Sequence, residues 1–342
     1  MTGMWSGIIA SMASTPATDR RSGSPATILY GLIRSMRPRQ APKNGLVLIA
    51  LFFTVNKWWD LDQFEGMVWL IATSASATLI FIIVSGVVYI VNDLFDAERD
   101  REHPRKRFRP IASGVVPRSV AWVTAIMLLI GAVAIGFVIS VSFGLIVVGY
   151  FGLSQAYNAF LKSTVILDVA TVSAGFVLRA AAGSAAIDGF AFGSDLDRFE
   201  LELTISPWLY VCTASGSLLI ALIKRRAELV SAGSNAVRQR PILGEYSVEL
   251  IDRLVAVVAP TTLMAYTLYT FSGNFLTNVN LPDNNSMMLT IPFVAYGLFR
   301  YLYLGYKNDM GESPEELLVR DPALLVTIML WLTTAALVLG LN

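Results

Sequence analysis

Three aspartates and an asparagine stand at the end of a long apolar run, spaced so that they could hold one metal ion. On a helix, Asp93, Asp96 and Asp100 fall within an arc of about 60°, which Asn92 widens to about 100°. Carboxylates near lipid are costly, so a cation is expected among them, and hard oxygen ligands suit Mg²⁺ bridged to phosphates. The alternative is a solvated helix end balanced by the Arg and Lys residues that follow. Tyr89, one turn earlier, either donates to a phosphate or belongs to an interfacial tyrosine belt.

A strongly basic stretch follows the acidic one directly. Five cations lie within the nine residues after Asp100, namely Arg101, Arg105, Lys106, Arg107 and Arg109. Pro104 and Pro110 prevent this stretch from continuing as a helix. A substrate with a diphosphate for a metal and a separate phosphate for the cations would suit both patches. Attraction to anionic lipid is the alternative interpretation.

Other charged residues lie within or at the ends of apolar runs. Lys224, Arg225 and Arg226 form a second basic cluster, which either binds a phosphate directly or anchors the chain on one side of a membrane. Arg179 lies about fifteen residues inside an apolar run, where an unpaired guanidinium is costly. It either binds the phosphate of an acceptor or pairs with a carboxylate such as Asp168.

Helices in a membrane must position these residues. The chain has 342 residues, of which 55% are hydrophobic and only 15% charged, with a mean hydropathy of +0.60. Soluble domains carry nearer 25% charged residues, so an ordinary soluble enzyme, a disordered chain and a nucleic-acid binder are excluded. Each membrane-crossing helix needs about 20 apolar residues. The apolar runs predict an all-α, polytopic membrane protein with spans near 43–59, 67–91, 119–139, 143–161, 165–187, 206–223, 251–272, 287–304 and 323–341.

The distribution of Lys and Arg between these spans predicts the orientation. Twenty-one of them fall in segments on one side, whereas the alternate connections contain only Lys57 and Arg198. Positive charge marks the cytoplasmic side, so the N-terminus is expected in the cytoplasm and the C-terminus outside. The long polar segments, and with them any chemistry on a soluble substrate, then face the cytoplasm at the cell's inner membrane.

The rarest residue types limit the cofactors. A single cysteine, Cys212, excludes an internal disulfide and a Cys-based zinc site, and a single histidine, His103, excludes multi-His metal sites. A metal must therefore be held by oxygen, which favours Mg²⁺. The net charge of +1, from 26 basic and 25 acidic residues, indicates no partner. Residues 1–30, rich in small and polar types, are expected to be a flexible segment.

The spacing of Asn92, Asp93, Asp96 and Asp100 resembles the first aspartate-rich motif of the UbiA-type membrane prenyltransferase superfamily. That superfamily has about nine helices bundled around a cytoplasm-facing cavity, so residues 31–342 are expected to form one such catalytic domain. One subgroup, the decaprenyl-phosphate phosphoribosyltransferases, is similar to this chain in the run D-R-E-H-P-x-K-R-F-R-P-I-A-x-G from Asp100. Upstream, Arg37-Pro38-Arg39-Gln40 and Lys43-Asn44 also resemble that subgroup. The similarity covers the chain from about residue 34 to its end, through Tyr157 to Lys162, Asp168, Leu178-Arg179-Ala180 and Lys224-Arg225.

The resemblance implies transfer of 5-phosphoribose from phosphoribosyl diphosphate to a polyprenyl phosphate such as decaprenyl phosphate, toward arabinose donors for cell-wall polymers. Mg²⁺ would be held by Asn92, Asp93, Asp96 and Asp100, the three carboxylates being catalytic. The acceptor is already an anion, so no general base is needed. The expected substrate-binding residues are Lys43, Tyr89, Lys106, Arg107, Tyr157, Lys162, Asp168, Arg179, Lys224 and Arg225.

The chain departs from the prenyltransferases after the sixth span. Their second aspartate-rich motif is replaced by the basic cluster that begins at Lys224, which disfavours a second metal and favours direct phosphate binding. An aromatic prenyltransferase of quinone or haem synthesis, the alternative enzyme, would need both metals. A transporter would be expected to show internal repeats or helices broken at mid-membrane, and no convincing repeat is present. A homo-oligomer is left open, and the outer segment 188–205 has no interpretation.

Overall fold

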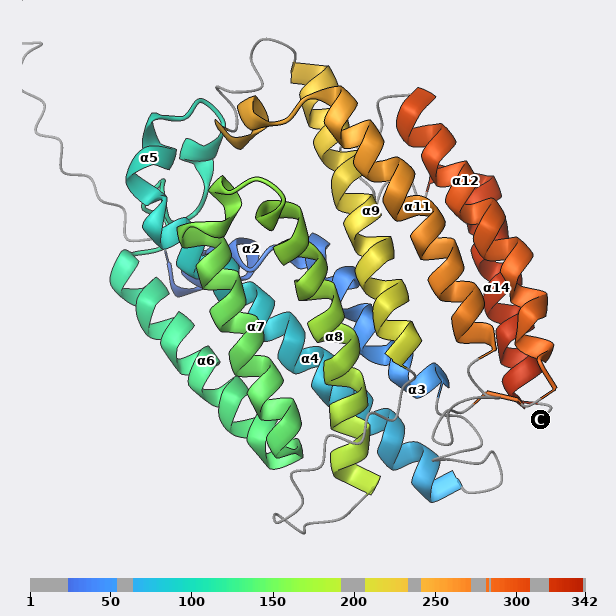
Figure 1. The fold of residues 1–342 in the computed structure, drawn as a ribbon. Helices are drawn as coiled ribbons and strands as arrows, with labels where there is room; N and C mark the ends of the chain where they lie inside the picture. Colours follow the sequence, from blue (N-terminus) through green and yellow to red (C-terminus); the bar gives the residue numbers. More distant parts are fainter. Residues whose placement is uncertain are drawn as a thin grey trace, which may run out of the picture. The chain divides into compact units, whose positions relative to one another are not determined.

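The protein is helical throughout the part that the structure describes. This structure, a computed structural model, describes residues 24–53, 64–191, 207–232, 241–271, 281–282, 284–307 and 320–340. Within these ranges there is no β-strand, and the predicted all-α class is confirmed (Figure 1). Residues 1–23, Lys57, Arg198 and most of the outer segment 188–205 lie outside the described residues.

Long α-helices follow one another, with short 3-10 helices between some of them. The α-helices are α2 (Pro25–Ser35), α3 (Ile49–Phe53), α4 (Phe64–Phe95), α5 (Ala97–Glu102), α6 (Arg118–Ile139), α7 (Val141–Ala159), α8 (Leu167–Ala191), α9 (Pro207–Ala232), α11 (Val248–Thr270), α12 (Ile291–Lys307) and α14 (Pro322–Gly340). The 3-10 helices are η1 (Pro38–Leu48), η2 (Lys106–Phe108), η3 (Leu161–Ser163), η5 (Pro241–Glu245) and η7 (Ser286–Thr290).

Six segments among the described residues are long and apolar enough to cross a membrane. They are Gly66–Phe95, Arg118–Ile139, Leu167–Asp188, Pro207–Ser231, Ser286–Lys307 and Pro322–Gly340. These segments coincide with six predicted spans, and the other three overlap α7, α11 and the pair η1 and α3. The chain is a polytopic membrane protein, as predicted, while the full count of nine crossings stays a prediction.

Serine side chains begin several of the helices. The hydroxyl oxygens of Ser24, Ser140 and Ser247 accept hydrogen bonds from backbone N–H groups three residues later, at 3.3, 3.0 and 3.1 Å. Each bond satisfies one of the donors that a helix start leaves unpaired. Because the first of these caps starts α2 at Pro25, the last residues of the segment predicted to be flexible, 1–30, are helical.

The chain divides into two compact units. Unit 1 contains Met1–Pro38 and Tyr89–Ile126, and unit 2 contains Arg39–Val88 and Met127–Asn342. In unit 1, α2 packs closely on the segment before α6, because a Cβ placed on Gly31 would lie 2.6 Å from Val116 Cγ2. This packing places the end of α2 beside the residues that follow α5.

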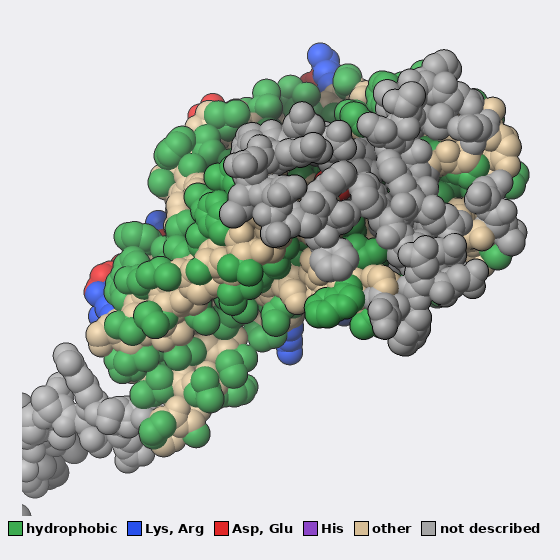
Figure 2. Space-filling view, turned by 90° about the horizontal axis from the view of Figure 1, so that it is seen from below, with side chains coloured by type: hydrophobic (Ala, Val, Ile, Leu, Met, Phe, Trp, Pro, Cys, Tyr) green, Lys and Arg blue, Asp and Glu red, His purple; other side chains and the backbone are tan. Residues whose placement is uncertain are grey.

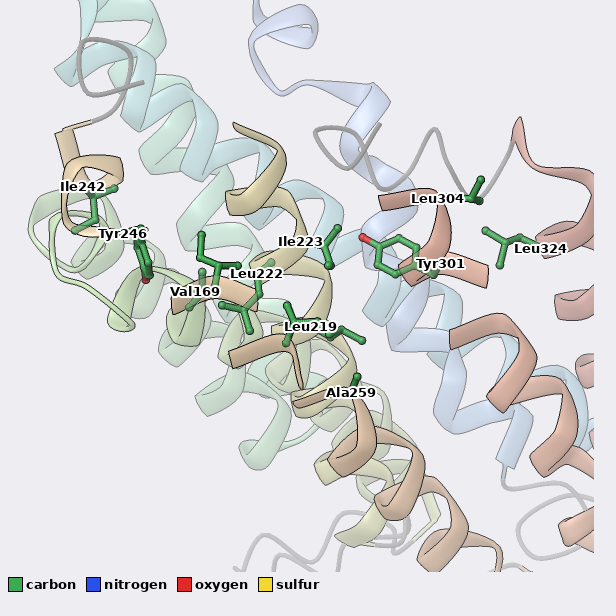
Figure 3. Close-up of a cluster of buried hydrophobic side chains, with 13 residues drawn as sticks. Val169, Leu219, Leu222, Ile223, Ile242, Tyr246, Ala259, Tyr301, Leu304 and Leu324 are labelled. Carbon is green, nitrogen blue, oxygen red and sulfur yellow. The ribbon is translucent and has the colours of Figure 1, made fainter. Parts of the chain in front are cut away.

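Unit 2 is built from long helices packed side by side. Helix α9 lies between α8 and α11, α7 packs on α8, and α12 packs on α14 (Figure 1). Side chains from α8, α9, α11, α12 and α14 meet in one buried cluster that includes Leu222, Ile223 and Tyr301 (Figure 3). This apolar packing sets the positions of the polar side chains that enter the bundle from α8 and α9.

The outward surface is itself largely apolar. On α6, the side chains at helical spacing Val123, Ile126, Met127 and Ile130 are at least half exposed. Hydrophobic side chains also cover most of the coloured surface in Figure 2, where Lys, Arg, Asp and Glu are sparse. In water such a surface would favour aggregation, whereas in a bilayer it contacts lipid.

Helix α8 approaches the start of the chain's first apolar segment so closely that only glycine fits at one position. A Cβ on Gly183 would lie 2.1 Å from the Val47 carbonyl oxygen and 3.1 Å from Ala50 Cβ. The obstruction is backbone, which cannot rotate away as a flexible side chain does. The close contact therefore fixes α8 against η1 and α3.

Gly183→Ala is expected to lower the free energy of unfolding by about 1–3 kcal/mol, because the added methyl group overlaps backbone. Gly152→Ala in α7 is the matched control, since a Cβ there meets nothing within 4 Å. It should be neutral or slightly stabilising, by up to about 1 kcal/mol. Thermal unfolding of the detergent-solubilised protein measures both, and equal behaviour of the two variants would contradict the close packing.

Candidate active site

Two buried carboxylates near the end of α4 share one arginine. Asp93, in the last turn of α4, is 3% exposed, and Asp100, in α5, is 1% exposed. The Nη1 group of Arg109 donates to both, at 3.2 Å from Asp93 Oδ1 and 2.7 Å from Asp100 Oδ2. Arg37 Nη2 donates to the same Asp93 oxygen at 2.9 Å. The predicted cation among these carboxylates is therefore supplied by the chain itself.

Asp96 is not among the carboxylates that Arg109 contacts. It is the turn residue between α4 and α5, and its carboxylate pairs with Arg99 near the surface. No group of three or more acidic, His or Cys side chains in the described part of the chain lies close enough to hold a metal. The assignment of Asp93, Asp96 and Asp100 as ligands of one metal stays a prediction.

The donor chemistry of this region nevertheless fits Mg²⁺. The side-chain oxygen of Asn92 is buried without a hydrogen-bond partner, which costs free energy unless a ligand satisfies it. Asp93 and Asp100 add the carboxylate oxygens that Mg²⁺ prefers. Movement of Arg109 would release Asp100 and leave Asp93 paired with Arg37 alone.

Arg37 reaches this cluster through an unusual backbone conformation. It directly follows the end of α2 at Met36 and has a φ of 55°, which is uncommon for a residue other than glycine. Its guanidinium lies 4.6 Å from the centre of the Tyr89 ring, a cation–π contact. The predicted phosphate ligand Tyr89 thus orients Arg37 toward Asp93.

The basic stretch after α5 presents its cations to solvent. The side chains of Lys106 and Arg107 are exposed, and Arg107 lies 4.9 Å from the centre of the Phe108 ring. His103 Nδ1 accepts hydrogen bonds from the backbone N–H groups of Arg105 and Lys106, at 3.2 and 3.3 Å, which shapes the turn. Exposed cations are accessible to an anionic ligand, and the assignment of Lys106 and Arg107 as substrate-binding residues stays a prediction.

In unit 2, a second buried ionic cluster joins α8 to α9. Asp168, in the first turn of α8, is completely buried and accepts a hydrogen bond from Arg225 Nε at 3.0 Å. Arg225 also pairs with Glu228, one turn later in α9. The Arg225 side chain is only 5% exposed, so the two carboxylates balance a charge that burial would otherwise penalise.

Tyr246, just after η5, ties this cluster to the connection before α8. Its hydroxyl donates to Asp168 Oδ1 at 2.7 Å and accepts from the backbone N–H of Ile166 at 2.8 Å. Burial and the hydrogen bond to Asp168 raise the pKa of Tyr246 to about 12. The hydroxyl therefore stays protonated and keeps donating at neutral pH.

The structure bears on two sequence-based interpretations of these residues. Arg225 is predicted to bind a phosphate; its guanidinium is enclosed and paired with two carboxylates, and its assignment as a phosphate ligand stays a prediction. The alternative pairing of Asp168 with Arg179 is wrong, because Asp168 pairs with Arg225. Eleven residues along α8 place Arg179 about 16 Å from Asp168, too far for contact.

Arg179 is buried in unit 2 with neutral partners only. Its Nε donates to Asn44 Oδ1 at 2.9 Å, its Nη1 to the Gly175 carbonyl at 2.8 Å and its Nη2 to the Tyr150 hydroxyl at 2.6 Å. The hydroxyl of Ser85 bonds to both Asn44 and Tyr150. Among the described residues, no carboxylate pairs with Arg179. Its positive charge inside an apolar bundle is therefore suited to an anion.

The remaining predicted residues lie on short elements or helix ends of unit 2. Lys43 is in η1, next to Asn44, and Lys162 is in η3. Tyr157, near the end of α7, is close enough to Arg225 for an electrostatic interaction. Lys224 lies within α9 and, like the other three, is half-buried. The structure leaves their assignment as substrate ligands a prediction.

Arg37 and Arg109 are absent from the site residues predicted from the sequence, although both contact Asp93. Arg109 belongs to the basic stretch after Asp100, and Arg37 begins the R-P-R-Q segment. The usable signal is charge balance: buried carboxylates require cations, and basic residues flank the motif in sequence. Asn44 and Tyr150, which hold Arg179, are uncharged, so charge balance does not identify them.

Comparisons with known proteins cover nearly the whole chain. The model of the UbiA prenyltransferase family matches residues 46–318. The decaprenyl-phosphate phosphoribosyltransferase of Mycolicibacterium smegmatis is 31% identical over 92% of this chain and 93% of that protein. The decaprenyl-phosphate phosphoribosyltransferase of Corynebacterium glutamicum is 30% identical over 92% and 88%. The structure of a UbiA homolog from Archaeoglobus fulgidus bound to DMAPP and Mg²⁺ has a TM-score of 0.61 at 15% identity, over 91% of this chain and 99% of that one, which shows a common fold.

Asp168→Ala is expected to lower the free energy of unfolding by about 3–5 kcal/mol, because it leaves a buried guanidinium short of a partner. Tyr246→Phe removes one hydrogen bond to the same carboxylate and should cost about 0.5–1.5 kcal/mol. Glu249→Ala is the control, since it breaks a fully exposed ion pair with Arg253. Thermal unfolding of the solubilised protein ranks the three. A change at Asp168 as small as the control would contradict a structural ion pair.

Proposed function

Because the chain belongs to the UbiA prenyltransferase family, we propose that it is a phosphoribosyltransferase acting on a membrane-bound polyprenyl phosphate. It transfers 5-phosphoribose from phosphoribosyl diphosphate to decaprenyl phosphate or a similar lipid, and releases diphosphate. The names of the relatives that are about 30% identical over most of the chain support this pentosyl transfer. The product would then supply arabinose donors for cell-wall polymers.

The observation that carries the proposal is the charge pattern within unit 1. Buried carboxylates, Asp93 and Asp100, are followed by exposed cations, Lys106 and Arg107. Phosphoribosyl diphosphate has two matching groups, a diphosphate on C1 and a separate phosphate on C5. A prenyl diphosphate has no phosphate apart from its diphosphate, so it would leave the basic stretch without a ligand.

The first of these groups is the leaving group. Asn92, Asp93 and Asp100, with Asp96 in the following turn, would hold Mg²⁺, which supplies neutralisation of the charge that develops on diphosphate. Lys106 and Arg107 donate to the 5-phosphate and so fix the ribose relative to the carboxylates. Holding the sugar at both ends orients C1 for attack.

The transfer needs little proton chemistry from the protein. An oxygen of the acceptor phosphate forms the new bond to C1, and the bond between C1 and the diphosphate oxygen breaks with its electron pair leaving on diphosphate. The acceptor is an anion at neutral pH, so no general base is required. Attack opposite the leaving group inverts the configuration at C1.

Arg179 is the residue best suited to the acceptor's phosphate. It lies inside the apolar bundle of unit 2, where a prenyl chain would be accommodated, and its partners are Asn44, Tyr150 and a backbone carbonyl. A phosphate would balance the charge that these neutral groups leave uncompensated. Lys43 and Lys162, which are half-buried in the same unit, are further candidates.

An aromatic prenyltransferase is less well supported. It would need a second acidic motif near the end of α9, but that helix contains a single acidic residue, Glu228, and this residue pairs with Arg225.

The distribution of Lys and Arg in the sequence supports an active site on the cytoplasmic side of the inner membrane. In that orientation the N-terminus is cytoplasmic and the C-terminus lies outside.

Purified protein with Mg²⁺, polyprenyl phosphate and radiolabelled phosphoribosyl diphosphate is expected to move label into the organic phase. Asp93→Asn should lower this transfer by at least about 100-fold, because it removes charge at the diphosphate site. Glu98→Gln is the control, an exposed acidic residue of the same unit. Label transfer from a prenyl diphosphate to an aromatic acceptor, with none from phosphoribosyl diphosphate, would refute the proposal.

Arg179→Gln is expected to raise the KM for polyprenyl phosphate about 10- to 100-fold, the value of a charge-assisted contact. The KM for phosphoribosyl diphosphate should stay near that of the unchanged protein. Ser173→Ala, which removes a hydroxyl buried between α8 and α9, controls for a general loss of packing. Equal increases in both KM values would assign Arg179 a structural role instead.

A further inference from the structure

Arg109 and Arg37 already neutralise the two carboxylates that a divalent cation would use. Arg109 contacts one oxygen of Asp93 and one of Asp100, and Arg37 contacts the same Asp93 oxygen. The two guanidiniums and two carboxylates sum to zero charge. A doubly charged cation added to this group leaves an excess of two positive charges, which is unfavourable where the carboxylates are buried.

The excess charge can be removed in one of two ways. Either the arginines move away from the carboxylates, or an anion with several negative charges joins the group. Diphosphate brings about both changes. It adds negative charge to the group, and it draws the arginines away from the carboxylates, because guanidinium binds phosphate oxygens in a two-pronged geometry as well as it binds carboxylate. A cation alone gains much less from this site than a cation together with diphosphate.

We propose that Arg109, assisted by Arg37, is an exchangeable counter-ion that makes binding of the divalent cation and of diphosphate mutually dependent. Arg109 holds Asp93 and Asp100 until both ligands arrive, then releases the carboxylates to the cation and donates to diphosphate. This inference rests on the proposed use of a cation and diphosphate by this site. It adds that the site disfavours a cation without its substrate.

The surroundings of the two arginines permit such an exchange. The Arg109 side chain is 28% exposed and that of Arg37 is 36% exposed. Neither residue lies within an α-helix: Arg109 follows η2, and Arg37 follows α2 with a left-handed φ. Arg225 provides the contrast, because it is held within α9 and its side chain is 5% exposed. A paired arginine with this freedom can change partners, whereas Arg225 cannot.

The buried oxygen of Asn92 is a second, independent indication of a ligand. It belongs to the residue beside Asp93 and has no hydrogen-bond partner. The arginine contacts that satisfy the two carboxylates do not include it. A divalent cation would satisfy this oxygen as well as the carboxylates that Arg109 releases.

The test measures cation binding rather than transfer. Mn²⁺ is titrated into the detergent-solubilised full chain, with and without inorganic diphosphate, and bound Mn²⁺ is followed by electron paramagnetic resonance. Arg109→Gln is compared with Arg118→Gln, a matched control whose arginine pairs with the exposed Glu98 in the same unit. Arg37→Gln serves as a second variant of the proposed mechanism.

Diphosphate is expected to raise Mn²⁺ affinity strongly in the unchanged protein and in Arg118→Gln. In Arg109→Gln, Mn²⁺ affinity without diphosphate should rise at least about tenfold, because the competing cation is gone, and the enhancement by diphosphate should shrink. Arg37→Gln should change both in the same direction by less. Mn²⁺ should also raise the unfolding temperature of Arg109→Gln more than that of the unchanged protein.

Unchanged or weaker Mn²⁺ affinity in both Arg109→Gln and Arg37→Gln, with their thermal unfolding still cooperative, would overturn the inference. So would an enhancement by diphosphate equal to that of the unchanged protein. These outcomes are independent of the proposed function. A chain that shows the exchange but transfers no phosphoribose would refute only the choice of substrate.

Discussion

A charge buried in an apolar body must be neutralised where it lies, and the polar structure of this protein follows from that constraint. Each buried carboxylate discussed above has a guanidinium partner: Asp93 and Asp100 have Arg109, and Asp168 has Arg225. Since an unpaired buried charge costs several kcal/mol, these pairs determine which helix ends can lie together. They also decide where a charged ligand could bind.

The buried arginines differ in how firmly the chain holds them. Arg225 projects from the middle of a long helix, is enclosed, and has carboxylates on two sides. Arg109 and Arg37 lie outside α-helices and are partly exposed. Arg179 is a third case, a buried cation whose partners are all neutral. The proposed exchange of partners concerns Arg109 and Arg37, whereas Arg179 can take an anion as an additional partner.

Much of the fold follows from the sequence because lipid imposes a simple rule. A segment that crosses a bilayer must satisfy its backbone hydrogen bonds internally, so a long apolar run is a helix. Runs such as 119–139 and 323–341 are helices within one residue of their predicted ends. The first run, 43–59, is the weakest: its described part begins as the 3-10 helix η1, with Pro42 inside, before the short α3. Helical periodicity alone does not reveal such a change.

The sequence by itself determined the helical class, the membrane setting and the chemical character of the candidate site, because each depends on composition and spacing along the chain. It could not assign partners to the charges. Asp96 pairs with Arg99 and not with the arginines that hold Asp93. Asp168 pairs with Arg225, 57 positions away, rather than with Arg179 on its own helix. Only tertiary packing decides which cation reaches which carboxylate. Coulomb energy depends on distance and burial in space, and neither is encoded in separation along the chain.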